Sequence, residues 1–401
     1  MTRPAPIYLD HAATTPVRAE VLEAMLPYFS ARFGNPSSSH RVGREARAAF
    51  DEARERLATT LGAHADEIVF TSGGTESDNL AILGTWRKRR AEGRDVVVTA
   101  PTEHKAVLEV AHHVAHEGGT ERLVAVDADG VVTTAALEAQ LDARVAVVSL
   151  MWINNETGVV QDIPALAARA RACGATVHTD AVQAFGKVPI DLRTLPVDLL
   201  ALSGHKLGGP KGIGALYVRR GTPLAPLLHG GAQDRGRRPG TENVAAAIGL
   251  AVAAELAVAE RERECARLAA LRDALERALL ARVPDAVVHG AGATRAPHVL
   301  NVSVPGTDSE SLLMALDLAN ICASGGSACQ SGSVGASHVL AAMGVPRDLA
   351  AGALRLSVGA LTTEACIART AEVFPALVEK ARRLSGTSSP GAPIACAFDA
   401  R

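Results

Sequence analysis

The sequence predicts an α/β protein with a mostly parallel sheet, followed by a smaller α+β domain. Between about residues 67 and 218, short β-branched runs alternate with helical patterns, which is typical of parallel strands joined by helices. The 401 residues exceed the length at which a single hydrophobic core usually stops growing. After Pro284, strand-like runs return among helical ones. This favours a second domain of roughly one hundred residues.

The elements of the first region follow from local composition. A helix begins near Pro164 and ends at Cys173-Gly174, where glycine closes it. From residue 245 to about 282 the pattern is long and rich in Ala, Leu, Glu and Arg, which indicates a helix leading out of the first domain. The clearest strands are residues 67–71, 95–99, 145–150, 175–179 and 197–202, with 212–218 as a further strand.

The second region carries strand-like runs at residues 287–289, 298–304 and 354–358. We expect four parts along the chain. They are an N-terminal segment that packs with the small domain (1–15), a large domain (16–258), a small domain (259–384), and a Ser/Gly/Pro-rich tail that is disordered (385–401).

Charge and composition exclude several classes of partner. The 41 basic and 43 acidic residues give a formal charge of −2, which offers no electrostatic basis for binding nucleic acid or a membrane. No apolar signal segment stands at the N-terminus, and the most apolar run, 244–254, is too short to span a bilayer. The six cysteines form no Cys-x-x-Cys pair. We therefore expect reduced thiols and a cytoplasmic location.

Polar, reactive residues follow five of the predicted strands. In open α/β sheets, ligands bind outside the carboxyl ends of the strands, so we expect these clusters to converge on one site. The clusters are residues 72–77, residues 102–105, residues 154–158, Asp180 with Gln183, and residues 203–206.

The first cluster has two glycines, Gly73 and Gly74, and the Thr75 hydroxyl at a strand-to-helix turn. Free backbone amides and the helix dipole at such a turn favour a phosphate. An ordinary Ser/Thr cap after a glycine turn gives the same pattern, and this cluster taken alone favours the cap.

Lys206 and Asp180 point to a cofactor. A partly desolvated lysine at the mouth of a sheet has a lowered pKa and forms Schiff bases, and an aspartate at a neighbouring strand end can keep a pyridinium nitrogen protonated. Pyridoxal phosphate requires both groups. Each residue alone is also typical of a surface lysine or a capping aspartate, and the phosphate turn tips the balance toward the cofactor. His104, at another strand end, could stack on the ring and move protons.

Two further residues stand out against their surroundings. Arg355 interrupts an apolar strand, so it must pair with a carboxylate, which could belong to the protein or to a substrate. Cys329 lies in a Ser/Gly-rich run, 324–333, that cannot pack a core. A thiol in such a loop suits a nucleophile that reaches a substrate and then withdraws.

These residues resemble the cysteine desulfurases, within the class V aminotransferase group of fold type I pyridoxal-phosphate enzymes. The Cys329 loop is similar to that of the subgroup with the longer, Ser/Gly-rich catalytic loop. The resemblance implies a large domain with a seven-stranded, mostly parallel sheet. It runs nearly end to end, through residues 8–16, 34–37, 71–79, 102–107, 154–162, 178–183, 203–214, 238–244 and 324–331.

The resemblance also implies a role for each site residue. Lys206 would hold pyridoxal 5'-phosphate as a Schiff base, Asp180 its ring nitrogen and Gln183 its phenolic oxygen, with His104 stacked on the ring. Asn155 and Arg355 would bind the substrate carboxylate. The phosphate would be held by Gly74, Thr75, Ser203 and His205, joined by Thr241 from the second subunit of a homodimer.

The implied reaction removes sulfur from L-cysteine. Lys206 takes the Cα proton, Cys329 attacks the sulfur, and the products are L-alanine and a persulfide on Cys329. The persulfide would pass to an acceptor protein for iron–sulfur cluster assembly or tRNA thiolation. Two alternatives are a selenocysteine lyase, or another class V lyase, and a sulfur-carrier subunit that works only with a partner.

The chain departs from the family pattern in three places. Ala360 and Leu361 stand where members often carry Arg-Phe, and Gln330 replaces a more usual Thr. The tail after Leu384 does not match the C-terminus that members present to an iron–sulfur scaffold, and Cys396 has no assigned role.

Overall fold

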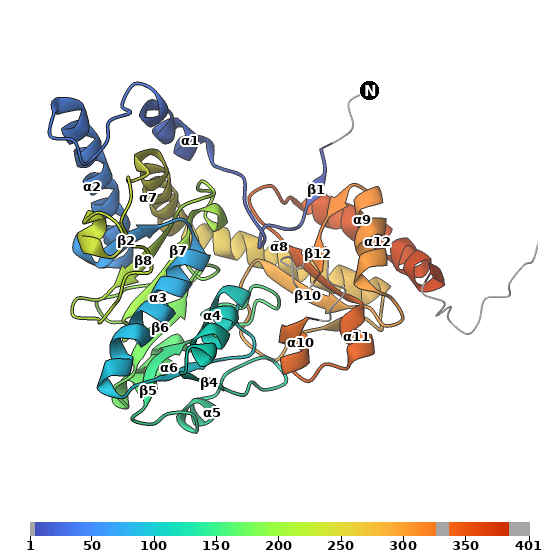
Figure 1. The fold of residues 1–401 in the computed structure, drawn as a ribbon. Coiled ribbons are helices and arrows are strands. Elements are labelled where there is room, and N and C mark those ends of the chain that lie inside the picture. Colours follow the sequence, from blue (N-terminus) through green and yellow to red (C-terminus); the bar gives the residue numbers. More distant parts are fainter. Residues whose placement is uncertain (1–4, 326–336, 385–401) are drawn as a thin grey trace, which may run out of the picture.

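The computed structural model describes residues 5–325 and 337–384 (Figure 1). Its largest element is a seven-stranded sheet in the order β2-β8-β7-β6-β5-β3-β4. From β7 to β4 all neighbours are parallel, whereas β8 runs antiparallel to both β7 and β2. The predicted mostly parallel sheet is confirmed. Its strands are β2 (Ile68–Thr71), β3 (Val96–Thr99), β4 (Thr120–Leu123), β5 (Val145–Ser149), β6 (Thr176–Asp180), β7 (Leu199–Ser203) and β8 (Gly214–Val218).

The one strand of this sheet that the sequence did not predict is β4. Its residues, Thr-Glu-Arg-Leu, are only partly buried, and it pairs with β3 alone. An edge strand with one free side does not need the apolar run that marks a central strand, so its sequence carries little strand signal.

Helices cover both faces of this sheet (Figure 1). On one face, α3 (Gly74–Arg89) and α4 (Lys105–His116) pack Trp86 and Val110 against Val97 and Val147. The other face is covered by α2 (Arg41–Leu61), α6 (Ile163–Ala172) and α7 (Val244–Ala259). The shorter α1 (Ala19–Met25) lies against α7, and α5 (Thr134–Glu138) against α6. The central strands are buried on both faces, which explains their nearly continuous apolar runs.

A second, four-stranded antiparallel sheet has the order β12-β13-β10-β9. Its strands are β9 (Val287–Val288), β10 (Val299–Ser303), β12 (Ser324–Gly325) and β13 (Ala353–Ser357). A core of its own joins this sheet to α8 (Arg261–Arg282), α9 (Ser309–Leu318) and α12 (Glu364–Leu384). The short α10 (His338–Ala342) and α11 (Arg347–Ala351) contribute a separate small cluster of apolar residues.

The long helical pattern after residue 245 is two helices rather than one. The first, α7, ends at Ala259, and α8 begins at Arg261. Between them, Glu260 accepts hydrogen bonds from Arg18 at 2.7 and 3.1 Å. The N-terminal segment is therefore tied to the point where the chain passes from one helix to the next.

The N-terminal segment connects the two sheets. Its strand β1 (Ile7–Tyr8) pairs in parallel with β11 (Ile321–Cys322), and Leu9 lies in the core of the second sheet. Farther along, the Thr15 backbone N–H donates to the His205 carbonyl, at the end of β7. Residues 7–15 thus run from the second sheet to the first, along the seam where a site could lie.

Several predictions fall outside the described residues, namely those on the Cys329 loop, Gln330, the tail 385–401 and Cys396. Within residues 5–325 and 337–384, no helix has the length and apolar character needed to cross a bilayer.

Candidate active site

A pocket of about 330 Å³ lies at the carboxyl ends of the large sheet's strands, between that sheet and the second one. The strand-end clusters therefore converge as the sequence analysis expected. Thr241 does not line this pocket but a separate hollow with Ser72 and Arg238, and Cys329 lies outside the described residues. The ten remaining predicted site residues all line the pocket: Gly74, Thr75, His104, Asn155, Asp180, Gln183, Ser203, His205, Lys206 and Arg355.

Lys206 follows β7 on a single 3₁₀ turn, Gly204–Lys206. Its ammonium group donates to the carbonyls of Ala12 and Ala13 at 2.6 and 2.7 Å. These two carbonyls belong to the N-terminal segment, so that segment fixes the direction of the lysine side chain. A side chain held at its tip in this way presents its nitrogen at one defined position in the pocket.

Asp180 is the last residue of β6 and is 6 % exposed. One carboxylate oxygen accepts from the Val182 backbone N–H at 2.8 Å. Burial raises the pKa of Asp180, while His104, this backbone bond and Lys206 favour the ionised form. A positively charged group in the pocket would stabilise the carboxylate further.

His104 stands at the N-terminus of α4, where its Nδ1 accepts from the Ala106 backbone N–H at 3.1 Å. This cap orients the imidazole ring, because a lone pair on Nδ1 is committed to the helix. His104 is therefore placed by the start of α4, near Asp180.

Gly74 begins α3 at the opposite side of the pocket. A Cβ at this position would lie 2.9 Å from a methyl group of Val182, so only glycine allows the helix to start this close to the end of β6. The α3 N-terminus, with Thr75 and Ser203 beside it, therefore faces into the pocket with its backbone donors.

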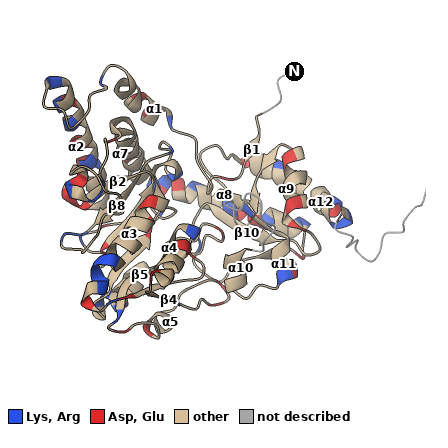
Figure 2. Ribbon diagram, in the orientation of Figure 1, with Lys and Arg blue, Asp and Glu red and all other residues tan. Residues whose placement is uncertain are grey.

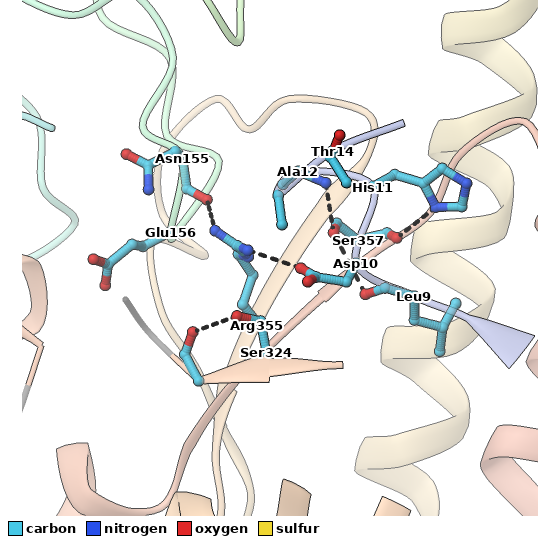
Figure 3. A network of polar contacts seen from close by, with 12 residues as sticks. Leu9, Asp10, His11, Ala12, Thr14, Asn155, Glu156, Ser324, Arg355 and Ser357 are labelled. Atoms are coloured by element: carbon cyan, nitrogen blue, oxygen red, sulfur yellow. Dashed lines mark hydrogen bonds and ion pairs between the residues drawn. The ribbon is translucent and has the colours of Figure 1, made fainter. Parts of the chain in front are cut away.

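The side of the pocket nearest the second sheet is built around Arg355, which is 1 % exposed in the middle of β13 (Figure 3). Its guanidinium donates to the Asn155 carbonyl at 3.0 Å and to an Asp10 carboxylate oxygen at 2.8 Å. The sequence left open whether a protein or a substrate carboxylate pairs with Arg355. In this structure the partner is Asp10, from the N-terminal segment.

Asn155 owes its position to its neighbour Asn154. The Asn154 side chain donates to the Thr102 carbonyl at 2.8 Å and accepts from the backbone N–H groups of Glu156 and Thr157, both at 2.9 Å. These hydrogen bonds to the Asn154 side chain form a turn after β5, and the turn places Asn155 at the pocket.

Sequence reasoning assigned no role to several residues that shape the pocket, among them Asp10, Glu156, Met151 and His338. Asp10 and Glu156 were inside motifs noted for the family resemblance but received no role. His338 Nε2 contacts the Glu103 carbonyl at 2.9 Å. It stands on α10, and no local pattern in the sequence relates that helix to Glu103.

Glu156 is almost fully buried between the two sheets. Its carboxylate accepts from the Ser337 hydroxyl at 2.5 Å, and its carbonyl accepts from the Asn301 side chain at 3.1 Å. Burial raises the pKa of Glu156 to about 7, against the opposing effects of the Ser337 bond and Arg355. At neutral pH a proton can therefore reside on or leave this pocket-lining carboxyl group.

Comparisons with known proteins agree on one family. The sequence model of the aminotransferase class-V family matches residues 7–369. A protein of Gluconacetobacter diazotrophicus named cysteine desulfurase is 48 % identical over 94 % of this chain and 95 % of its own length. The cysteine desulfurase IscS of Dictyoglomus turgidum is 44 % identical over 94 % of this chain and 96 % of its own.

Among solved structures, a NifS-like protein superposes with a TM-score of 0.85 at 35 % identity, covering 95 % of this chain and 99 % of the other. The fold of the chain is thus similar to that of a solved protein of this group. The chain belongs to the class-V aminotransferase family.

Proposed function

We propose that this protein is a cysteine desulfurase, which converts L-cysteine to L-alanine and retains the sulfur as a persulfide. One observation carries the proposal: a lysine amine, a buried aspartate and a buried arginine, Lys206, Asp180 and Arg355, face a single pocket. The relatives named cysteine desulfurase, at 44 and 48 % identity over 94 % of the chain, support it.

The pocket residues fit pyridoxal 5'-phosphate as the cofactor. Asp180 is a buried carboxylate that a pyridinium nitrogen would stabilise, and the α3 N-terminus, beginning at Gly74, offers backbone donors to a phosphate. Gln183 and His104 line the same pocket. Bound there, the cofactor would supply an electron-accepting ring that stabilises negative charge on the substrate Cα.

The chain's own residues would bind and orient the substrate. The Arg355 guanidinium, fixed by Asp10 and the Asn155 carbonyl, would hold the substrate carboxylate together with the Asn155 side chain. Lys206 would take the proton from the substrate Cα and later return a proton to the product. The hydrogen bonds of its amine to the Ala12 and Ala13 carbonyls support this role, because they hold the nitrogen at one position in the pocket.

For Cys329 we propose the role of sulfur acceptor. Its thiolate would attack the sulfur of the substrate, so that an S–S bond forms while the Cβ–S bond breaks. The electron pair of the broken bond remains with the substrate carbon, which takes up a proton and becomes L-alanine. The persulfide would then pass to an acceptor protein of iron–sulfur assembly or tRNA thiolation.

We propose a homodimer in which Thr241 of the second subunit joins the phosphate site. In support, Thr241 lies outside the pocket of its own chain, in a hollow with Ser72 and Arg238. Sedimentation of the holoenzyme tests this proposal. A dimer is expected, and a fully active monomer would contradict it.

The direct test is turnover of L-cysteine by the holoenzyme, with alanine measured as the product. Cys329→Ala is expected to reduce alanine formation about a hundredfold or more while the visible absorbance of the cofactor is retained. Cys366→Ala, a change of the same type on α12, serves as the matched control and should keep full activity. Full activity in Cys329→Ala would refute the desulfurase mechanism. A strong preference for L-selenocysteine over L-cysteine would instead identify a selenocysteine lyase.

A further inference from the structure

The lysine and arginine side chains that line the candidate active site are Lys105, Lys206 and Arg355. Two of them have partners: Arg355 pairs with Asp10 at 2.8 Å, and the Lys206 amine donates to two backbone carbonyls. The ammonium group of Lys105 makes no hydrogen bond or ion pair with any residue in 5–325 or 337–384. Within these ranges, Lys105 is therefore the cation of the pocket that remains available to a ligand.

Lys105 is the first residue of α4, and its side chain is partly buried. The N-terminus of a helix carries the positive end of the helix dipole, so a cation there is less favourable than a neutral or acidic residue. The residue before it, His104, already caps the helix by accepting from the Ala106 backbone N–H. The helix therefore does not need a positive charge at this position, which favours a role for Lys105 in binding an anion.

The charge of Lys105 acts on the side of the pocket that faces the second sheet. Burial raises the pKa of Glu156 to about 7, and Lys105 is among the charges that oppose this rise. Burial lowers the pKa of His338, and the charge of Lys105 lowers it further. On the side proposed for the phosphate, the pKa of His205 is lowered to about 4 by burial and by two other lysines. Lys105 therefore belongs to the substrate side of the pocket.

The acids around the pocket do not neutralise Lys105. Burial raises the pKa of each acid in the pocket or next to it, namely Asp78, Glu103, Glu156 and Asp180. Glu156, which is close enough to sense the charge of Lys105, instead accepts from the Ser337 hydroxyl at 2.5 Å. A carboxylate paired with a lysine would have a lowered pKa, whereas that of Glu156 is raised. Figure 2 shows basic and acidic residues on the helices of both sheets, so the excess of positive charge at Lys105 is local.

Each anionic group of the proposed reaction has a proposed partner except the sulfur. The α3 N-terminus would hold the phosphate, Gln183 the ring oxygen, and Arg355 with Asn155 the substrate carboxylate. The terminal sulfur of a persulfide is more acidic than a thiol, and a neighbouring lysine lowers the pKa of a sulfur atom further. The transferred sulfur therefore becomes an anion, and the cation still available in the described part of the pocket is Lys105.

The chain that follows Cys329 also returns to this side of the pocket. Residues 326–336 contain Cys329, and the described structure resumes at residue 337. Ser337 donates to the Glu156 carboxylate, and His338 Nε2 donates to the Glu103 carbonyl at 2.9 Å. Glu156 and His338 are the two residues whose pKa responds to the charge of Lys105. The chain therefore returns from Cys329 to a point near Lys105.

We propose that Lys105 is a further catalytic residue, whose ammonium group binds the substrate sulfur and stabilises the negative charge that this sulfur carries in the persulfide. The S–S bond to Cys329 forms while the Cβ–S bond breaks, and the electron pair of the broken bond stays with the carbon. The proton of the substrate thiol passes to solvent, and Lys105 keeps its own protons. This inference deepens the proposed desulfurase function and rests on it.

The test separates the sulfur step from the steps at the substrate Cα. Alanine formation from L-cysteine by the holoenzyme requires both, whereas exchange of the Cα proton of L-alanine in deuterium oxide involves no sulfur. Lys105→Met removes the charge and keeps most of the side-chain length, and it should lower kcat with L-cysteine about ten- to a hundredfold. The exchange rate of L-alanine, and its dissociation constant from the cofactor absorbance, should stay within about twofold of the wild type.

Two further variants serve as controls. Lys105→Arg keeps the charge and should restore most of kcat, and Lys88→Met, the same substitution in the exposed last turn of α3, should behave as the wild type. An unchanged kcat in Lys105→Met would overturn the inference alone. An equal loss of L-alanine binding or exchange would also overturn it, because Lys105 would then serve the carboxylate or the cofactor. A wild type that forms no alanine from L-cysteine would overturn the proposed function and this inference with it.

Discussion

The two sheets contribute to the candidate active site in different ways. The seven-stranded sheet supplies residues just beyond its strand ends, such as Asp180 at the end of β6 and Lys206 on the turn after β7. The four-stranded sheet supplies Arg355 from the middle of a buried strand. Strand-end residues are held by local turns, whereas Arg355 is held by contacts with distant segments. The large sheet is thus suited to placing a cofactor, and the small one to fixing a charged group against it.

The largest loss of activity should follow from a change at Lys206, on the turn after β7. Lys206→Ala is expected to reduce alanine production from L-cysteine about a thousandfold, because it removes the amine that we propose transfers the proton. The visible absorbance that depends on a lysine-bound cofactor should disappear as well. Lys211→Ala, a neighbouring exposed lysine, is the matched control and should change neither quantity. Substantial turnover in Lys206→Ala would place the reacting amine elsewhere.

A change at Arg355, in the middle of β13, should weaken substrate binding rather than cofactor binding. Arg355→Lys keeps the charge but loses the two-pronged guanidinium, so kcat/KM should fall roughly ten- to a hundredfold, mainly through KM. The cofactor absorbance should remain as in the wild type, because the residues that we propose for cofactor binding lie at the strand ends of the other sheet. Arg347→Lys on exposed α11 controls for the substitution itself. If Arg355→Lys instead weakened cofactor binding, it would be wrong to assign cofactor binding to the large sheet and substrate binding to the small one.

A smaller effect should follow from Asp10→Asn. The amide can still accept from Arg355 but lacks the charge that fixes the guanidinium, so we expect KM for L-cysteine to rise about tenfold with a smaller change in kcat. The measurement is steady-state kinetics with L-cysteine. An unchanged KM would show that Arg355 is oriented without Asp10, for example by the Asn155 carbonyl alone.

The last prediction concerns stability rather than turnover, at Glu156 in the seam between the two sheets. Its pKa is about 7 in the folded protein and about 4.5 in the unfolded chain, so the folded state holds an extra proton between these values. The stability that this protonation provides is therefore present below pH 4.5 and lost as the pH rises toward 7. In urea unfolding, the wild type should lose about 3 kcal/mol over this range relative to Glu156→Gln. If the free energies of unfolding of the two proteins changed with pH in the same way, the raised pKa of Glu156 would be contradicted.

The sequence was informative about the large sheet because strand ends follow from local patterns. Buried parallel strands give apolar runs, and the polar residues after them share one edge, so Asp180, Gln183 and Lys206 could be predicted to lie together. The edge strand β4 and the break at Glu260 were missed, since neither carries a strong local signal.

Contacts between distant segments could not be read in the same way. The pairing of Arg355 with Asp10 joins residues 345 positions apart, and the sequence showed only that Arg355 needed some carboxylate. The cavity of about 590 Å³ that shares Val182, Gln183 and Lys206 with the candidate active site is a further case, because it depends on how Ala360 and Leu361 face the start of α8. Its only signal was that these two side chains are shorter than those of many family members.

The N-terminal segment has a consequence for the order in which the protein is made. Its strand β1 pairs with Ile321–Cys322, so residues 7–12 must wait for a partner that leaves the ribosome more than three hundred residues later. All seven strands of the large sheet have been synthesised by Val218, and that sheet can fold first. The carbonyls that hold Lys206 and the carboxylate that holds Arg355 arrive only when this early segment docks. A growing chain can therefore have a folded large sheet well before its candidate active site is complete.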